Sequence, residues 1–384
     1  MRVYALEPTG AFESGSDITS RPRATYRVDK VADITRPFDN RYSGGGFQYF
    51  SCGGNRGRSL LLDRLCQCGR TAGSTSRDGR GIVMIARRGD FIVFIVTAFG
   101  LAWVLGVGPW LDGQGLRSHW LRTGAGLMML TPTLGVLAVA GSRRISLSEL
   151  VSQVGLRLGD KPARVLWSII GAWLGMIALV WGAFGLAAAF GLFEFDFSYY
   201  NAGWMAALLV ADLTTAILVN IPLTLGEEIG WRGWLMPQLV NRFGIFAGVI
   251  TTGVIWALWH APLTLLGYNY PELGAWAVVA FIGFCVTVGC ILGWLRLWSG
   301  SVWPSAVAHA ASNATMGSIS VFAASGRQPH SLLSAGGVTG WVLFAIVAAT
   351  LFAIFPVRTA GHRDRPAGGH ALRDAAGVSR NYRL

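Results

Sequence analysis

The stretch LTLGEEIGWRGWLM, from Leu223 to Met236, decides what kind of protein this sequence encodes. It lies in one of the most apolar parts of the chain, yet it carries two adjacent glutamates and an arginine. A charged side chain at the centre of a membrane helix costs about 2.5–3.5 kcal/mol on insertion scales. The three charges are therefore tolerable only if they face the interior of a helical bundle, pair with one another, or lie near the membrane surface.

The composition of the whole chain is that of a membrane protein. Of 384 residues, 52% are hydrophobic and only 14% are charged, whereas a soluble domain carries about 25% charged residues. Eight apolar segments are long enough to cross a membrane, which takes about 20 helical residues. They cover residues 91–111, 121–140, 165–191, 204–225, 245–266, 275–295, 302–323 and 338–355. Because a barrel strand would be shorter and alternating, we predict an all-α, polytopic transmembrane helical bundle of about eight spans.

Positive charge lies in the loops beside these spans. The formal net charge of +12 could suggest nucleic acid, but we exclude that partner because the arginines gather next to predicted spans. They precede the first span, fill the connection between the second and third, and follow the fourth, sixth and eighth, whereas an alternate loop carries Glu194 and Asp196. Arg117 and Arg122 fit this pattern less well. Since positive loops stay in the cytoplasm, we expect a multi-pass protein in the lipid bilayer of the plasma membrane, with both termini cytoplasmic.

The two ends of the chain differ from the spans. Residues 1–83 are rich in Gly, Ser and Arg and show no sustained period, which predicts a disordered polar extension. Met84, followed by Arg87, Arg88 and the first span, resembles a natural start, so one hypothesis places the start of translation there and the alternative keeps a genuine cytoplasmic tail. The remaining divisions are N-terminal spans (84–200), a core (204–325), a final span (326–357) and a basic flexible tail (358–384).

The glutamates and arginine of the opening stretch have fixed spacings. Glu228 and Arg232 are four residues apart, so they share a helix face and can form an ion pair. Glu227 is rotated by about 100° from Glu228 on a helix, so the two carboxylates cannot both face the arginine. We therefore expect Glu228 to pair with Arg232 and Glu227 to face a cavity.

Two further polar clusters occur in later apolar segments. WALWH places His260 four residues after Trp256, and HAASN places Asn313 four residues after His309. The positive-inside topology predicts that these side chains and Glu227 meet in one cavity in the cytoplasmic half of the bilayer.

Such a cavity could perform hydrolysis of an amide in either of two ways. In one, Glu227 takes a proton from water as general base, while the histidines and Asn313 donate hydrogen bonds to the developing oxyanion. In the other, Glu227, His260 and His309 hold one divalent metal such as zinc, with the fourth position open. The zinc-protease helix H-E-x-x-H does not occur in the chain.

The three clusters, EEIGWR, WALWH and SVWPSAVAHAASN, resemble the signature motifs of the CPBP intramembrane protease family. That family contains CAAX prenyl endopeptidases and bacterial proteins linked to bacteriocin processing and immunity. Its pattern is E-E-x-x-x-R, then F-x-x-x-H, then H-x-x-x-N or D, and Trp256 stands where phenylalanine is usual. The resemblance covers about residues 204–325.

The resemblance implies a CAAX prenyl endopeptidase-like intramembrane protease, of a family named for metalloproteases, that acts on a membrane-associated peptide or protein. It implies a functional set of Glu227, Glu228, Arg232, His260, His309 and Asn313. The first glutamate and first histidine would activate water, and the second histidine and the asparagine would stabilise the oxyanion. Two alternatives stay open: a non-catalytic immunity or regulatory protein that keeps the fold, and a transporter that uses the same polar residues as a substrate path.

Overall fold

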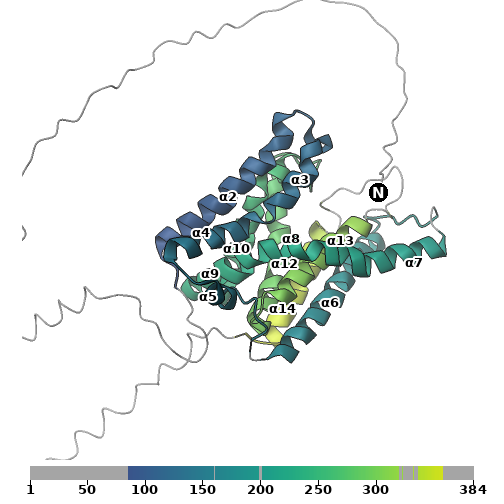
Figure 1. The fold of residues 1–384 in the computed structure, drawn as a ribbon. Helices are drawn as coiled ribbons and strands as arrows, with labels where there is room; N and C mark the ends of the chain where they lie inside the picture. Colours follow the sequence, from purple (N-terminus) through teal and green to yellow (C-terminus); the bar gives the residue numbers. More distant parts are fainter. Residues whose placement is uncertain are drawn as a thin grey trace, which may run out of the picture. The chain divides into compact units, whose positions relative to one another are not determined.

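The computed structural model describes residues 85–159, 161–198, 201–319, 322, 332 and 336–357. All secondary-structure elements within these ranges are helices, which confirms the all-α prediction (Figure 1). The helices are α2 (Arg88–Leu111), η2 (Gly115–Arg117), α3 (His119–Met128), α4 (Thr131–Arg143), α5 (Leu147–Gln153), α6 (Pro162–Ala189), α7 (Ala202–Ala211), η3 (Asp212–Ala216), α8 (Ile217–Glu228), η4 (Ile229–Leu235), α9 (Met236–Phe243), α10 (Ile245–Trp259), α11 (Ala261–Leu265), α12 (Trp276–Ser299), α13 (Trp303–Ile319) and α14 (Val338–Ile354). The predicted disordered extension (1–83) and flexible tail (358–384) lie outside the described residues.

The described helices account for all eight predicted spans, although not all are long enough to cross a membrane. Five candidate spans are long and apolar enough: Arg88–Leu111, His119–Arg143, Pro162–Ala189, Ala202–Phe243 and Trp276–Ser299. Two shorter apolar helices are α10 and α14. α13 covers the seventh predicted span and most of its residues are buried, so it contacts protein along most of its length.

The fourth candidate span is longer than predicted. From Ala202 to Phe243 the chain forms one helical run of 42 residues, and two parts of it, η3 and η4, are π-helical. The predicted span ended at residue 225 because the charges that follow are unfavourable in lipid. The structure instead buries those charges among neighbouring helices, so the helix continues past them. A π-helical segment is rare and is frequently found at functional sites.

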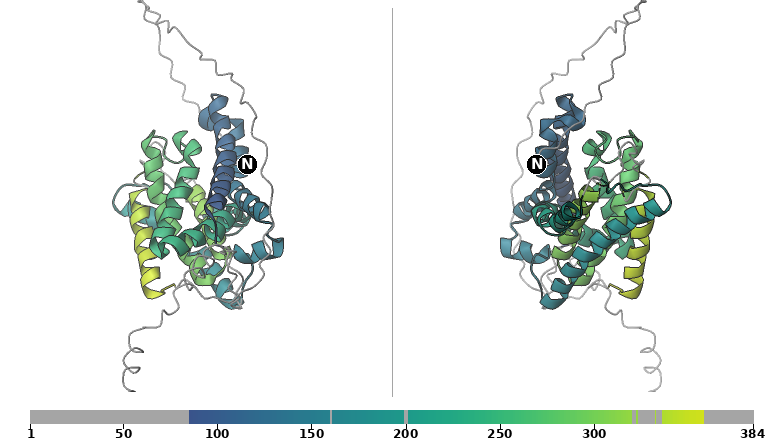
Figure 2. Two further views of the ribbon diagram at one scale, coloured as in Figure 1. Left: turned by 90° about the vertical axis from the view of Figure 1, so that its left-hand side faces the viewer. Right: turned by 90° about the vertical axis from the view of Figure 1, so that its right-hand side faces the viewer.

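Glycines let this long helix lie against α4. A Cβ atom on Gly230 would lie 2.3 Å from Cβ of Pro132, and one on Gly226 would lie 2.8 Å from the carbonyl oxygen of Met129. No larger residue fits at either place without movement of the backbone. α13 packs on the other side of α8 and also contacts α6 and α12, while α14 lies on the far side of the bundle from α2 (Figure 2).

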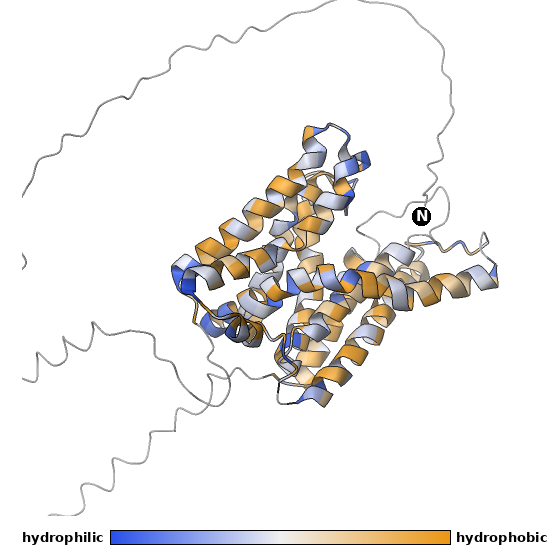
Figure 3. Cartoon of the chain, in the orientation of Figure 1, coloured by the Kyte–Doolittle hydropathy of each residue, from blue (hydrophilic) through white to orange (hydrophobic). Residues whose placement is uncertain are grey.

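The outer faces of the helices are apolar, as a lipid environment requires. Ile92, Val104 and Trp167 are 63%, 75% and 71% exposed. Figure 3 shows this apolar character along the outward sides of the long helices, with hydrophilic residues gathered near the helix ends. Contiguous exposed apolar surface of this kind marks a membrane-contacting face.

We call one end of the bundle the basic end. It comprises the start of α2, the connection from α4 to α6, the junction of α9 and α10, and the turn between α12 and α13. Hydrogen bonds join these segments: the backbone N–H of Ala86 donates to Gln238 (3.0 Å), and the Ser301 hydroxyl donates to the carbonyl of Gly155 (2.9 Å). Most arginines of the described residues lie here, including Arg143 and Arg157.

The opposite end is tied together by its own contacts. The indole of Trp110, at the end of α2, donates to the carbonyl of Pro262 in α11 (2.9 Å). The Tyr270 hydroxyl donates to the carbonyl of Gly336, just before α14 (2.5 Å). Burial raises the pKa of the Tyr270 phenol, so this group remains a donor at neutral pH. Each long helix therefore runs between a basic end and an end that is poor in arginine.

Candidate active site

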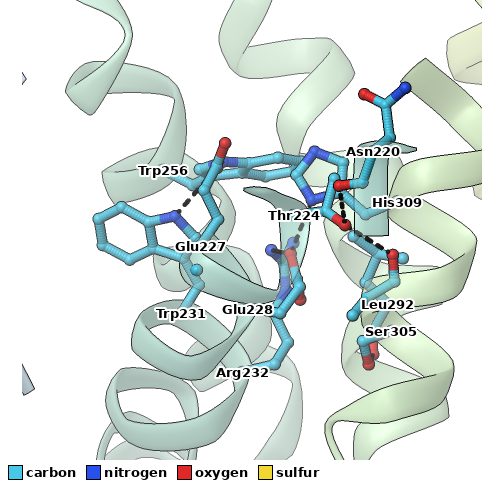
Figure 4. A network of polar contacts seen from close by, with 12 residues as sticks. Asn220, Thr224, Glu227, Glu228, Trp231, Arg232, Trp256, Leu292, Ser305 and His309 are labelled. Carbon is cyan, nitrogen blue, oxygen red and sulfur yellow. Dashed lines mark hydrogen bonds and ion pairs between the residues drawn. The ribbon is translucent and has the colours of Figure 1, made fainter. Parts of the chain in front are cut away.

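Three segments bring the predicted polar side chains together. The long helix carries Glu227 and Glu228 where α8 passes into η4, and the last turn of α10 carries Trp256 just before His260. His309 lies in the middle of α13, next to α8. Figure 4 shows the two glutamates pointing to different partners.

Glu228 is fully buried and pairs as expected. Its Oε1 accepts a hydrogen bond from Nη1 of Arg232 (2.8 Å) and faces Nδ1 of His309 (3.0 Å). Room for the arginine comes from Gly289 on α12, where a Cβ atom would lie 3.2 Å from Nη2 of Arg232. The ion pair thus lies inside the bundle and away from lipid, which explains why these charges occur in an apolar segment. Because Nδ1 of His309 is engaged, Nε2 is the nitrogen available to another group.

Glu227 has different partners. It is 1% exposed, and its Oε2 accepts hydrogen bonds from the indole nitrogens of Trp256 (2.6 Å) and Trp231 (3.3 Å). The carboxylate is thus held by two neutral donors rather than by a cation. A buried carboxylate without an adjacent cation is a candidate for accepting a proton.

His260 is held at the point where α10 ends. Its Nδ1 donates to the carbonyl of Trp256 (2.9 Å), which leaves Nε2 as the nitrogen that can contact water. The turn itself is fixed by α2, because the indole of Trp103 donates to the carbonyl of Trp259 (3.2 Å). The indole of Trp259 in turn donates to the carbonyl of Ala98 (3.2 Å).

One cavity of about 950 Å³ joins the predicted residues. Glu227, His260, His309 and Asn313 all line it, together with Trp256. Glu228 and Arg232 are not among its lining residues; they lie behind His309 and support it.

The cavity extends from the glutamates toward the end opposite the basic end. Its lining includes the start of α3, the segment 268–270 and Gly336, which all lie toward that end. The long helix continues to Phe243, so the glutamates lie near its middle, and the cavity-lining Asn220 precedes them. The location of the cavity in the cytoplasmic half of the bilayer stays a prediction.

Among the described residues, no group of three or more histidine, cysteine, aspartate or glutamate side chains is arranged to hold one metal ion. Glu227, His260 and His309, the three ligands considered for zinc, line the same cavity. Binding of one divalent metal by these three residues stays a prediction.

Three residues of this site had no role assigned from the sequence. Trp256 was noted only as the aromatic residue of the second motif and Trp231 only within the opening stretch, whereas their indoles bind Glu227. Asn220 lines the cavity seven residues before Glu227 and so lies on the same helix face. The spacing of four between Glu227 and Trp231 was a signal that could have found that contact.

The comparisons with known proteins agree with this core. Residues 207–315 match the family described as type II CAAX prenyl endopeptidase Rce1-like. A segment of 75 residues is 32% identical to CAAX prenyl protease 2 of Methanococcus maripaludis. This part of the chain is similar to the CAAX protease family. All six predicted site residues fall within the matched segment.

The extent of the similarity is limited to part of each protein. The aligned segment covers 18% of this chain and 28% of the relative, so the chain spans less than a third of that relative's length. The family similarity and the apolar helices together indicate a multi-pass membrane protein.

Proposed function

We propose that this protein is an intramembrane endopeptidase of the CAAX protease family that hydrolyses a peptide bond in a membrane-associated peptide or protein. The observation that carries the proposal is the shared cavity, because Glu227, His260, His309 and Asn313 come from three helical segments and line one space. A carboxylate beside a cavity can act as general base, and imidazole and amide groups can donate hydrogen bonds to the oxyanion formed during hydrolysis of an amide.

The reaction begins with a water held between Glu227 and Nε2 of His260. Because Oε2 of Glu227 is occupied by the indoles, Oε1 is the oxygen that takes the proton from water. The water oxygen attacks the carbonyl carbon of the scissile bond and forms a tetrahedral intermediate.

The developing oxyanion is stabilised by donors from α13. The side-chain amide of Asn313 donates to it, and so does His309, one helical turn away, through Nε2–H in the imidazolium form that carries a proton on each ring nitrogen. Glu228 and Arg232 hold His309 in this orientation through its Nδ1. The proton on Glu227 then passes to the leaving nitrogen, the C–N bond breaks, and a carboxyl product and an amine are released.

We place this reaction in the plasma membrane, with the basic end and both termini on the cytoplasmic side, because arginine-rich loops stay in the cytoplasm. The substrate reaches the cavity within the bilayer, where the apolar side chains of Met128, Met129 and Phe284 line its walls. These side chains suit a segment that arrives from the lipid phase rather than from water.

The test is comparative peptidomics of membranes that carry the wild-type protein or Glu227→Gln. Glutamine keeps the size of the side chain and cannot take up the proton, so the cleavage products present with the wild type should disappear. Glu149→Gln, which changes a carboxylate in α5 at the basic end, is the matched control and should leave the products unchanged. Identical peptide pools, together with an unchanged cellular phenotype, would instead support a non-catalytic immunity, regulatory or transport function.

A further inference from the structure

Trp256 contacts four polar residues of the candidate site: Glu227, His260, His309 and Arg232. Its indole N–H donates to Oε2 of Glu227 (2.6 Å), and its carbonyl accepts the hydrogen bond from His260 (2.9 Å). Its ring packs edge-on against His309, with 5.1 Å between ring centroids. The guanidinium carbon of Arg232 lies 4.4 Å from the centre of the same ring.

The two oxygens of Glu227 are made different by this tryptophan. Oε2 is the acceptor of both indoles, and the bond from Trp256 is much the shorter of the two, at 2.6 Å against 3.3 Å for Trp231. A carboxylate that is fixed at one oxygen cannot rotate freely, so the other oxygen keeps one direction relative to the cavity. A catalytic group must be held within a narrow range of distance and angle for full activity.

We propose that Trp256 is a positioning residue for the proposed hydrolysis. Its N–H holds Oε2 of Glu227 and thereby presents Oε1 to the water. The inference rests on the proposed function, because Trp256 would orient Glu227, the general base of that reaction. Phenylalanine at this position would preserve the ring contacts with His309 and Arg232 and would lose the donor to the glutamate.

The experiment uses purified full-length protein in detergent and a quenched peptide that ends in a farnesylated cysteine followed by three residues. We expect Trp256→Phe to lower kcat by about 10- to 100-fold, the range for loss of a hydrogen bond to a charged group or of a group that orients a reactive one. KM should stay at the wild-type value, because the indole N–H contacts Glu227 and not the substrate. Trp231→Phe should have a smaller effect, since its bond to the same oxygen is longer.

Trp234→Phe is the matched control. This tryptophan lies in η4, is buried, does not line the cavity, and its indole nitrogen has no hydrogen-bond partner among the described residues. The Trp234→Phe variant should retain the wild-type kcat. Thermal unfolding is followed for every variant, and benzothienylalanine at position 256, which replaces only the indole N–H by sulfur, serves if phenylalanine prevents folding.

The outcomes separate the two proposals. If the wild type cleaves the probe and Trp256→Phe or the sulfur analogue has the same kcat, the positioning role is overturned while the proposed function stands. An equal loss in Trp234→Phe, or a rise in KM with kcat unchanged, also overturns it. If the wild type cleaves no faster than Glu227→Gln, the proposed function fails and the role of Trp256 fails with it.

Discussion

The basic end and the centre of the bundle each bury a carboxylate, and they do so in different ways. At the basic end Asp90 accepts hydrogen bonds from Arg143 and from the backbone N–H of Arg87. At the centre Glu227 accepts hydrogen bonds from two indoles. An adjacent arginine favours the charged form of a carboxylate and occupies its oxygens, whereas neutral donors fix its geometry and leave it able to take up a proton. The comparison teaches that Asp90 is suited to anchor helices and Glu227 to move protons.

Glu228 shows that the kind of hydrogen-bond partner does not follow from burial alone. It is adjacent in sequence to Glu227 and equally buried, yet it is paired with Arg232 as Asp90 is paired with Arg143. Two neighbouring glutamates thus have the two kinds of hydrogen-bond partner that the basic end and the centre illustrate separately.

The sharpest contrast expected between the two regions is in their access to solvent. In a background without native cysteines, Gln114→Cys, in the α2–α3 connection, should react fully with a membrane-impermeant maleimide on intact cells. Leu147→Cys, in α5 and 71% exposed in the wild type, should react only after the cells are opened. The opposite pattern would place the basic end outside and would contradict the topology inferred from charge.

The next largest effect is expected at the buried ion pair. Glu228→Gln removes one charge and leaves Arg232 buried without its counter-ion, which should cost about 3–5 kcal/mol of folding free energy. Thermal unfolding in detergent measures this loss, and Glu149→Gln at the basic end is the control. An unfolding temperature equal to that of the wild type would show that the pair does not stabilise the bundle.

A smaller effect is expected where Arg232 meets α12. A methyl group at Gly289 would lie 3.2 Å from Nη2 of Arg232, so Gly289→Ala should displace the guanidinium and cost about 1–3 kcal/mol, as overpacking does. Gly171→Ala, in α6, meets no atom within 4 Å and is the matched control. Equal unfolding temperatures for the two variants would contradict the packing described around the arginine.

The smallest effect is expected at the basic end itself. Asp90→Asn removes a partly exposed ion pair, which is worth about 1 kcal/mol or less. Turnover of the quenched peptide should not change, because Asp90 does not line the cavity. A loss of turnover with normal stability would mean that the two regions are coupled.

Local features of this site could be predicted from the sequence because they depend on helical periodicity. The pairing of Glu228 with Arg232 follows from a spacing of four residues, and the division of labour between the glutamates follows from the rotation per residue. The all-α class follows from the length of the apolar segments.

The remaining features depend on contacts between helices, to which a single sequence gives little access. The fourth span was predicted to end too early. Hydropathy counts each charge as if it faced lipid, whereas Gly230 and Gly289 leave room for the charges to be buried between helices. The contact from Trp256 to Glu227 joins residues 29 apart in sequence and becomes visible only when α10 is placed beside the long helix.

The measurement that tests the account most directly is the turnover of purified Glu227→Gln on the quenched farnesylated peptide, with Asp90→Asn measured beside it. If Glu227 is the general base, the kcat of Glu227→Gln should fall by about 10²–10⁴-fold, while the unfolding temperature of this variant stays close to that of the wild type. The turnover of Asp90→Asn should also stay close to the wild-type value. A Glu227→Gln protein that turns over at the wild-type rate would contradict the central claim.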